Sequence, residues 1–265
     1  MVFGKIVAGL IGLLTGGFFG LVIGLIVGHF FDRALGSVFA FASPENLRRI
    51  RDNFFETTFL LSGYLAKSDG RVSEAEIAHT EQMFVQMGLS AQQRQRAIEL
   101  FRQGSGADFQ LEQVVTAFVQ TSGAQRQLQQ TLLLFLISLA HADQSVKPAE
   151  HAALVRIAGL MGIDARQLDM LLQMAAAQGQ FHSQGATSSG APVDRIQEAY
   201  TALGVDSAIS DKELKRAYRK LMSQNHPDKL IAKGVPEDMI RLATERSQEI
   251  QAAYEVLRKH RGMKT

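Results

Sequence analysis

The feature that most constrains the fold of this chain is an uninterrupted apolar run near its N-terminus. Residues 6–28 are 23 positions without a charged side chain or a side-chain amide. As an α-helix this run would be about 34 Å long, enough to cross the ~30 Å hydrocarbon core of a bilayer. A cleaved signal peptide has a shorter apolar region ending at a small-x-small site, whereas this run continues into GHFFDR. We therefore predict a short external tail and a single transmembrane helix within residues 1–31.

Five glycines of this run recur at every fourth position: Gly12, Gly16, Gly20, Gly24 and Gly28. Residues four apart lie on one stripe of a helix, where glycines let two helix backbones approach closely. The stripe predicts a helix–helix interface, and so a homodimer through the transmembrane helix. A glycine-rich span without a partner helix is the alternative interpretation.

The charges on the two sides of the run predict its orientation. Lys5 and the terminal amine precede it. Four arginines follow it: Arg33, Arg48, Arg49 and Arg51. Because short flanking segments rich in Lys and Arg stay in the cytoplasm, we expect the C-terminal bulk there and the N-terminus on the opposite side.

Composition excludes several classes of function. The 265 residues are 46% apolar and 20% charged, so the chain can build hydrophobic cores. It has no cysteine, which excludes disulfides, thiol catalysis and cysteine-ligated zinc or iron–sulfur centres. Its formal net charge of +2 is close to neutral and argues against a general nucleic-acid binder.

Residues 53–178 are predicted to form an all-α bundle, after a juxtamembrane segment at 32–52. Apolar residues recur at steps of three and four, and no long stretch alternates with period two. Ser43 as a cap and Pro44 in a first turn predict where the first helix begins.

Two stretches of the bundle resemble each other, LAKSDGRVSEAEI at 65–77 and LAHADQSVKPAEHA at 139–152. Their matching residues lie at a constant offset of 74: Asp69 with Asp143, Val72 with Val146, and Glu76 with Glu150. Pro148 suits a first helical position after the second turn. We predict a duplicated helical hairpin.

The four acidic residues of these turns, Asp69, Glu76, Asp143 and Glu150, allow two interpretations. They could converge on a metal ion across the repeat, or they could cap helix starts. Capping is favoured, because the turns lack the alternating acids and twelfth-position glutamate of a calcium-binding hand. We therefore predict no bound metal and no cofactor. The segment resembles the TerB-like helical domain of tellurite-resistance proteins, more closely in its first repeat than in its second.

Residues 179–193 are rich in Gly, Ser, Gln and Ala and lack apolar periodicity, which predicts a flexible linker. The final domain, residues 194–265, opens with a helix that Gly204 ends. Ser210 and Glu213 form a capping box for a second helix, and many of its exposed positions are basic. A further helix is predicted from about Pro236 to Arg258, and it should pack against the second as an antiparallel hairpin.

The sequence His226-Pro227-Asp228 follows the basic helix. Pro227 cannot continue that helix and disfavours helical geometry at His226, so the three residues are expected in an exposed turn. A catalytic pair would need a nucleophile or a pocket, and Ser223 is nearly the only candidate nearby. A metal site would need three or four ligands. Binding of nucleic acid by the basic helix is disfavoured, because acidic residues dilute its charge and no groove-reading motif is present.

The final residues resemble the J-domain, the Hsp70-activating module of DnaJ-type co-chaperones. The resemblance rests on four motifs in this order and spacing: LGV at 203–205, LKRAYRKL at 214–221, HPDK at 226–229 and EIQAAYEVL at 249–257. A J-domain is no catalyst itself; it stimulates ATP hydrolysis by a DnaK-type Hsp70. The resemblance implies that eight residues bind Hsp70: His226, Pro227, Asp228, Lys215, Tyr218, Arg219, Lys220 and Lys229.

The order of the parts resembles the membrane-anchored DnaJ-like co-chaperones of Gram-negative bacteria. It implies a non-enzymatic protein of the bacterial inner membrane with a periplasmic N-terminus. Its partners would be a DnaK-type Hsp70 and the lipid bilayer, with no nucleic acid. The alternative is a membrane-tethered sensor or adaptor, whose TerB-like domain binds a ligand or metal and whose basic helix binds another acidic partner.

Overall fold

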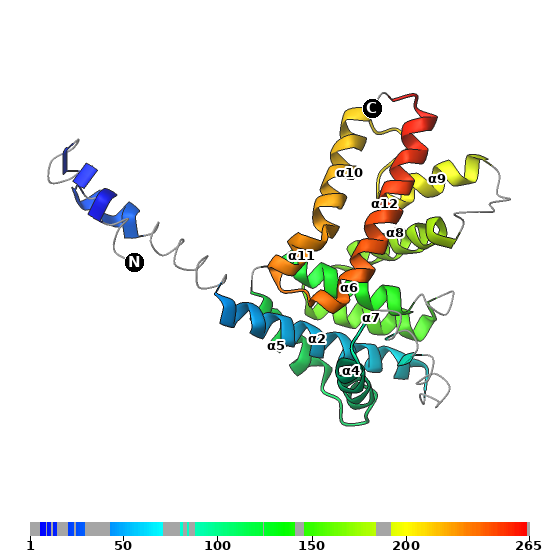
Figure 1. Cartoon of the computed structure of the whole chain (residues 1–265), viewed down its shortest axis with the longest axis horizontal. Helices are drawn as coiled ribbons and strands as arrows, with labels where there is room; N and C mark the ends of the chain where they lie inside the picture. The colour runs from blue at the N-terminus through cyan, green and yellow to red at the C-terminus, as the bar shows by residue number, and fades with distance from the viewer. Residues whose placement is uncertain are drawn as a thin grey trace. The chain divides into compact units, whose positions relative to one another are not determined.

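The computed structural model describes residues 43–70, 88–123, 125–140, 146–183 and 192–263. It also describes isolated positions: 6–8, 10, 11, 13, 14, 21–23, 25–29, 80, 81 and 84. Every regular element among these residues is a helix, which confirms the all-α prediction (Figure 1). The chain divides into two units, residues 1–49 and 50–265.

In the first unit, the described residues between Ile6 and His29 are helical. Their apolar side chains are widely exposed, with Ile6 at 61% and Leu14 at 80%. Among the described residues, no helix is both long and apolar enough for a membrane span. Of the predicted glycine stripe, the described part of the chain includes Gly28 in a helix; the other four members, Gly12, Gly16, Gly20 and Gly24, lie outside it. The dimer interface stays a prediction.

The second unit begins with a helical bundle. Its described elements are α2 (Pro44–Ala66), whose residues up to Arg49 belong to the first unit, η1 (Lys67–Asp69), α4 (Ala91–Gly104), α5 (Leu111–Ser122), α6 (Arg126–Ala140), α7 (Pro148–Leu160) and α8 (Ala165–Ser183). Buried phenylalanines form the centre of its core, where Phe54 meets the rings of Phe118 and Phe135 edge-on at 6.0 and 5.9 Å. Aromatic pairs prefer this geometry, so the bundle is held by specific contacts as well as by apolar burial.

Two predicted helix starts in the bundle are confirmed. The Ser43 hydroxyl accepts a hydrogen bond from the Asn46 amide at 3.3 Å, and α2 begins at Pro44. Pro148 opens α7, where its missing N–H costs no hydrogen bond. A third feature has no signature in the sequence: Gly63 and Gly104 let α2 and α4 touch backbone to backbone. A Cβ on Gly63 would lie 2.0 Å from the Phe101 carbonyl oxygen.

The C-terminal part contains α9 (Pro192–Ala202), α10 (Asp211–Asn225), α11 (Pro227–Lys233), η3 (Glu237–Met239) and α12 (Ile240–His260). As predicted, α10 and α12 lie side by side and run in opposite directions (Figure 1). Their buried residues form one core with α9, built from Ala199, Tyr200, Leu203, Leu214, Ile250, Ala253, Tyr254 and Leu257.

Two boundaries differ from the predictions. The helix α8 continues to Ser183, although the linker was predicted to begin at residue 179. Before this end, Ala177 of α8 is buried in the C-terminal core. The helix predicted from about Pro236 is instead η3 followed by α12, and Pro236, with φ −57° and ψ 139°, is the non-helical residue before η3.

The bundle and the C-terminal part pack together within the second unit. The helix α8 contacts both α9 and α12. The Gln178 side chain, buried at 4% exposure, donates a hydrogen bond from Nε2 to the Ala202 carbonyl at 2.8 Å. Satisfied buried polar groups of this kind specify one arrangement of neighbouring helices.

Candidate protein-docking site

His226, Pro227 and Asp228 form the junction of α10 and α11. His226 has extended geometry, with φ −66° and ψ 125°, as expected for a residue before proline. Pro227 then opens α11, so the predicted break after the basic helix is confirmed. The exposed turn is shorter than predicted, because Pro227 and Asp228 already belong to the first turn of a short helix.

Local hydrogen bonds define the shape of this junction. The His226 ring nitrogen Nδ1 accepts from the Asp228 amide at 3.2 Å, which requires the ring proton to be on Nε2. The His226 carbonyl accepts from the amides of Lys229 and Leu230, each at 3.1 Å. His226 thus acts as the N-cap of α11.

The side chains of His226 and Asp228 are exposed at this junction. Within the described part of the chain, no hydrogen-bond donor or cation contacts the Asp228 carboxylate. A carboxylate in this state can accept a charge-assisted, bidentate pair of bonds from an arginine of another protein.

The basic face of α10 precedes the junction. Lys215, Arg219 and Lys220 are exposed, and none of the three forms a salt bridge with a residue that the structure describes. Lys229 lies on α11, and its ammonium donates to the Ser223 hydroxyl. These four cations are suited to an acidic protein surface, because exposed charges steer association without requiring buried partners.

Tyr218 has a different position from these cations. Its ring stacks on Tyr254 of α12, with centroids 4.0 Å apart and planes inclined by 9°. Burial raises the pKa of Tyr218 above its ordinary value, with the nearby Glu255 and Tyr254 adding to the effect. The ring therefore supports α10 on α12, and a direct contact with a partner stays a prediction.

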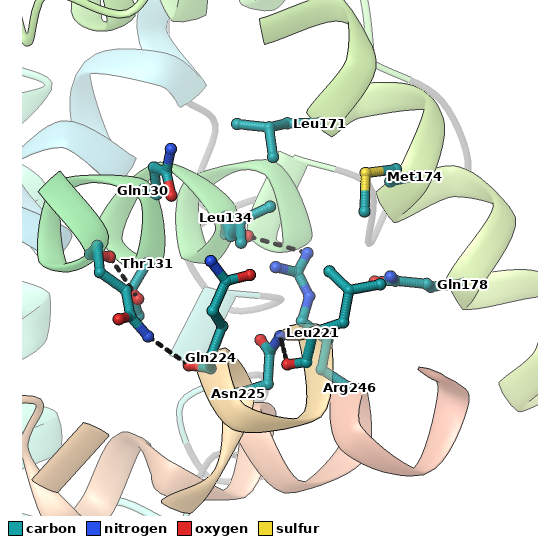
Figure 2. Close-up of a pocket in the computed structure, with 11 residues that line it drawn as sticks. Gln130, Thr131, Leu134, Leu171, Met174, Gln178, Leu221, Gln224, Asn225 and Arg246 are labelled. Carbon is teal, nitrogen blue, oxygen red and sulfur yellow. Dashed lines mark hydrogen bonds between the residues drawn. The ribbon is translucent and has the colours of Figure 1, made fainter. Parts of the chain in front are cut away.

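A cavity of about 70 Å³ lies at the end of α10, between α6, α8 and the C-terminal part. Figure 2 shows the residues that line it. Arg246 of α12 borders it and is 7% exposed. Its Nη2 donates to the Leu134 carbonyl at 3.5 Å and to the Ser138 hydroxyl at 3.2 Å, both on α6. Burial lowers the pKa of Arg246 to about 10, and the charge of Glu249 partly opposes this.

Neither Arg246 nor the cavity was anticipated from the sequence. No motif includes Arg246, and its helical position alone does not reveal which neighbour covers it. A cavity of this size accommodates a few waters rather than a substrate. Because the cavity is too small for a substrate, we infer that the residues lining it hold the end of α10 in place.

The acidic turn residues of the bundle lie apart from this junction. The Glu150 carboxylate accepts from the Lys147 amide at 2.9 Å, which confirms capping at that residue. Asp69 ends η1, and its side chain is outside the described residues, as are Glu76 and Asp143. Among the described residues, no group of three or more potential ligands is placed to hold a metal ion.

Three family models match consecutive parts of the chain. They are the DjlA co-chaperone transmembrane domain over residues 1–41, the tellurite resistance protein TerB over residues 56–173, and the DnaJ domain over residues 198–263. Both resemblances inferred from the motifs are thereby confirmed.

Several curated proteins are similar along most of their length. The co-chaperone protein DjlA of Escherichia coli O157:H7 is 38% identical over 269 residues, covering 98% of this chain and 98% of the relative. The DjlA protein of Coxiella burnetii is 37% identical, with 99% and 96% covered. That of Vibrio vulnificus strain YJ016 is 38% identical, with 81% and 80% covered. No solved structure matches the chain significantly.

Proposed function

The chain belongs to the DjlA family of co-chaperones, and on this premise we propose that it stimulates ATP hydrolysis by a DnaK-type Hsp70. It would do so at the cytoplasmic face of the inner membrane. In this proposal the chain supplies no reacting group. It acts by docking on the Hsp70, whose own active site performs the hydrolysis.

The observation that carries the proposal is the exposed carboxylate of Asp228, just beyond the end of a basic helix, which no donor or cation among the described residues contacts. Lys215, Arg219 and Lys220 would steer the domain toward an acidic Hsp70 surface, and each contributes modestly because solvent screens it. Asp228 would pair with an Hsp70 arginine. Because that contact excludes water and has charge on both sides, its loss should be far more costly than the loss of one steering charge.

The membrane location is supported by the match of residues 1–41 to a transmembrane domain family and by the exposed apolar side chains of that segment. The arginines that follow it favour a cytoplasmic C-terminal part. Anchoring would raise the effective concentration of the J-domain for clients at the membrane. We extend the proposal to a dimer through the glycine stripe.

The proposal is tested by single-turnover ATP hydrolysis of DnaK with the full chain in detergent micelles. We expect stimulation by the wild type and a loss of at least tenfold for Asp228→Asn, since removal of a charge-assisted bond costs about 1.5–3 kcal/mol. Glu237→Gln is the matched control, because it removes an exposed negative charge on the neighbouring η3. Equal stimulation by Asp228→Asn, or none by the wild type, would refute the proposal.

A further inference from the structure

One side chain of the bundle contacts both ends of the segment that carries the His-Pro-Asp junction. Gln127 lies in the first turn of α6. Its Nε2 donates to the Gln224 carbonyl at 2.9 Å, and its Oε1 accepts from the Lys233 ammonium. Gln224 lies in the last turn of α10, and Lys233 is the last residue of α11. The side-chain amide of Gln127 therefore joins the two ends of residues 224–233, the segment that contains His226–Asp228. We call this segment, which includes α11, the loop, and its two ends the loop base.

The two bonds are not typical of an exposed surface pair. Gln127 and Lys233 are both half-buried, and burial together with the charge of Lys229 lowers the pKa of Lys233. Gln224 also lines the cavity shown in Figure 2, where the facing wall belongs to α6 and α8. Hydrogen bonds that are partly shielded from water hold geometry more strongly than solvent-exposed ones.

Two further contacts at the loop base come from the C-terminal part itself. The Ser247 hydroxyl of α12 donates to the Asn225 carbonyl at 3.0 Å, and the Asn225 side chain donates to the Leu221 carbonyl at 2.9 Å. Arg246 joins α12 to α6 nearby. The end of α10 is thus held by α12 on one side and by the bundle, through Gln127, on the other.

We propose that Gln127 is a positioning residue for Hsp70 activation: it couples the TerB-like bundle to the orientation of the His-Pro-Asp junction. Small displacements of an interacting group reduce activity strongly, so a junction held at both ends is pre-organised for its partner. A client or ligand that shifts α6 would then change the activity of the J-domain. This inference rests on the function proposed above.

Gln130 provides a matched control on the same helix. It also borders the cavity and is half-buried, but no hydrogen bond of its side chain is formed with the residues that the structure describes. Gln127→Leu and Gln130→Leu therefore introduce the same chemical change on the same cavity wall. The first removes both bonds to the loop base, and the second removes neither.

The first test is amide hydrogen exchange of the full chain in detergent micelles. The Leu230 amide, within the loop, donates to the His226 carbonyl at 3.1 Å, and the Val235 amide, just after the loop, donates to the Leu230 carbonyl at 3.0 Å. In Gln127→Leu we expect them to exchange at least about three- to tenfold faster, the factor that loss of one of the two hydrogen bonds would give. Gln130→Leu should exchange like the wild type. Equal exchange in Gln127→Leu and wild type, or equal acceleration in both variants, would overturn the proposal.

The second test is a titration of DnaK single-turnover hydrolysis with the same proteins. Gln127→Leu leaves the basic face of α10 unchanged, so the concentration that gives half-maximal stimulation should stay the same. The maximal stimulation should fall several-fold. A shift confined to the half-maximal concentration would contradict a positioning role. Gln127→Glu keeps the acceptor for Lys233 and loses the donor to Gln224, so its maximal stimulation should lie between those of the wild type and Gln127→Leu. If the leucine variant does not fold, the glutamate variant tests the positioning role in its place.

The two proposals fail in different ways. If the wild type does not stimulate DnaK, the proposed function is wrong, while the exchange experiment still measures whether Gln127 holds the loop. If the wild type stimulates and Gln127→Leu matches it in both assays, only the positioning role is wrong.

Discussion

At the scale of single residues, the docking role that the J-domain motif implies agrees best with the structure for side chains that are charged and exposed. Asp228, Lys215 and Arg219 are exposed, as a docking surface requires. Tyr218 belongs to the same motif, yet its ring is stacked on Tyr254. A motif records which residues a family keeps together, but it does not separate those that touch a partner from those that hold the scaffold.

Arg261 holds several segments of the C-terminal part together, so its loss should weaken that part. It is 15% exposed, and its guanidinium contacts the Tyr200 hydroxyl at 2.7 Å, the Ile209 carbonyl at 2.6 Å and the Asp211 carboxylate at 2.9 Å. We expect Arg261→Ala to lower the free energy of unfolding by about 2–3 kcal/mol, because several bonds to one charge are lost together. Thermal unfolding followed by circular dichroism measures this.

Arg241→Ala is the control for Arg261, because Arg241 lies on α12, the helix that Arg261 caps, and its loss removes an exposed i,i+4 pair with Glu245. Such pairs contribute only about 0.3–0.5 kcal/mol. Similar destabilisation by the two variants would contradict the role of Arg261.

At the scale of elements, the start and the end of α10 follow directly from its residues. The Ser210 hydroxyl accepts from the Glu213 amide at 3.3 Å, and Glu213 accepts in return from the Ser210 amide at 3.2 Å. Pro227 excludes helix at His226. The helix α11 was missed, although its signals are present: a proline at its first turn and Gly234 in left-handed geometry, φ 102°, just after its end.

Removal of the capping hydroxyl should destabilise α10. We expect Ser210→Ala to cost about 1 kcal/mol at neutral pH, as is typical of N-caps. Urea unfolding with detection of the helical signal measures it. Ser207→Ala, in the preceding loop, is the comparison; a loss as large as that of Ser210→Ala would argue against a specific cap.

The same cap should weaken in acid. Hydrogen bonds from the Ser210 side chain and backbone lower the pKa of Glu213 from its ordinary 4.5. A carboxyl with a lowered native pKa stabilises the fold above its unfolded pKa, and this contribution is lost as the pH falls through the native value. The stability difference between wild type and Glu213→Gln should therefore be constant near neutrality and shrink below about pH 4. An unchanged difference at pH 3 would contradict this.

At the scale of the whole molecule, residues 50–265 form one unit. The composition of residues 179–193 predicts a flexible linker. The helix α8 extends to Ser183, into the first residues of that segment, and its Ala177 belongs to the C-terminal core. Gln127 and Arg246 add polar contacts between the bundle and the J-domain. The two domains can therefore influence each other through direct contact.

The proposed membrane dimer is also a prediction at this scale. Because the chain has no cysteine, crosslinking must use a reagent that reacts with other side chains. Crosslinking of the full chain in membranes should yield dimers. Replacement of Gly16 and Gly20 by leucine should abolish the dimers, because bulky side chains separate the helices. Gly9 and Gly17 lie off the stripe and are the matched controls. Unchanged dimers in the Gly16 and Gly20 variant would exclude this interface.

The sequence by itself determined the helical class, the order of the parts, the caps of α10 and the exposed His-Pro-Asp junction. These depend on local rules: apolar periodicity, capping hydrogen bonds and the geometry of proline. Only the tertiary structure decided that Gln127 reaches both ends of the loop, that Arg246 is buried on α6, and that Tyr218 stacks on α12. The contacts of Gln127 and Arg246 join residues more than 90 positions apart, and all of these contacts depend on how whole helices pack, which no local pattern encodes.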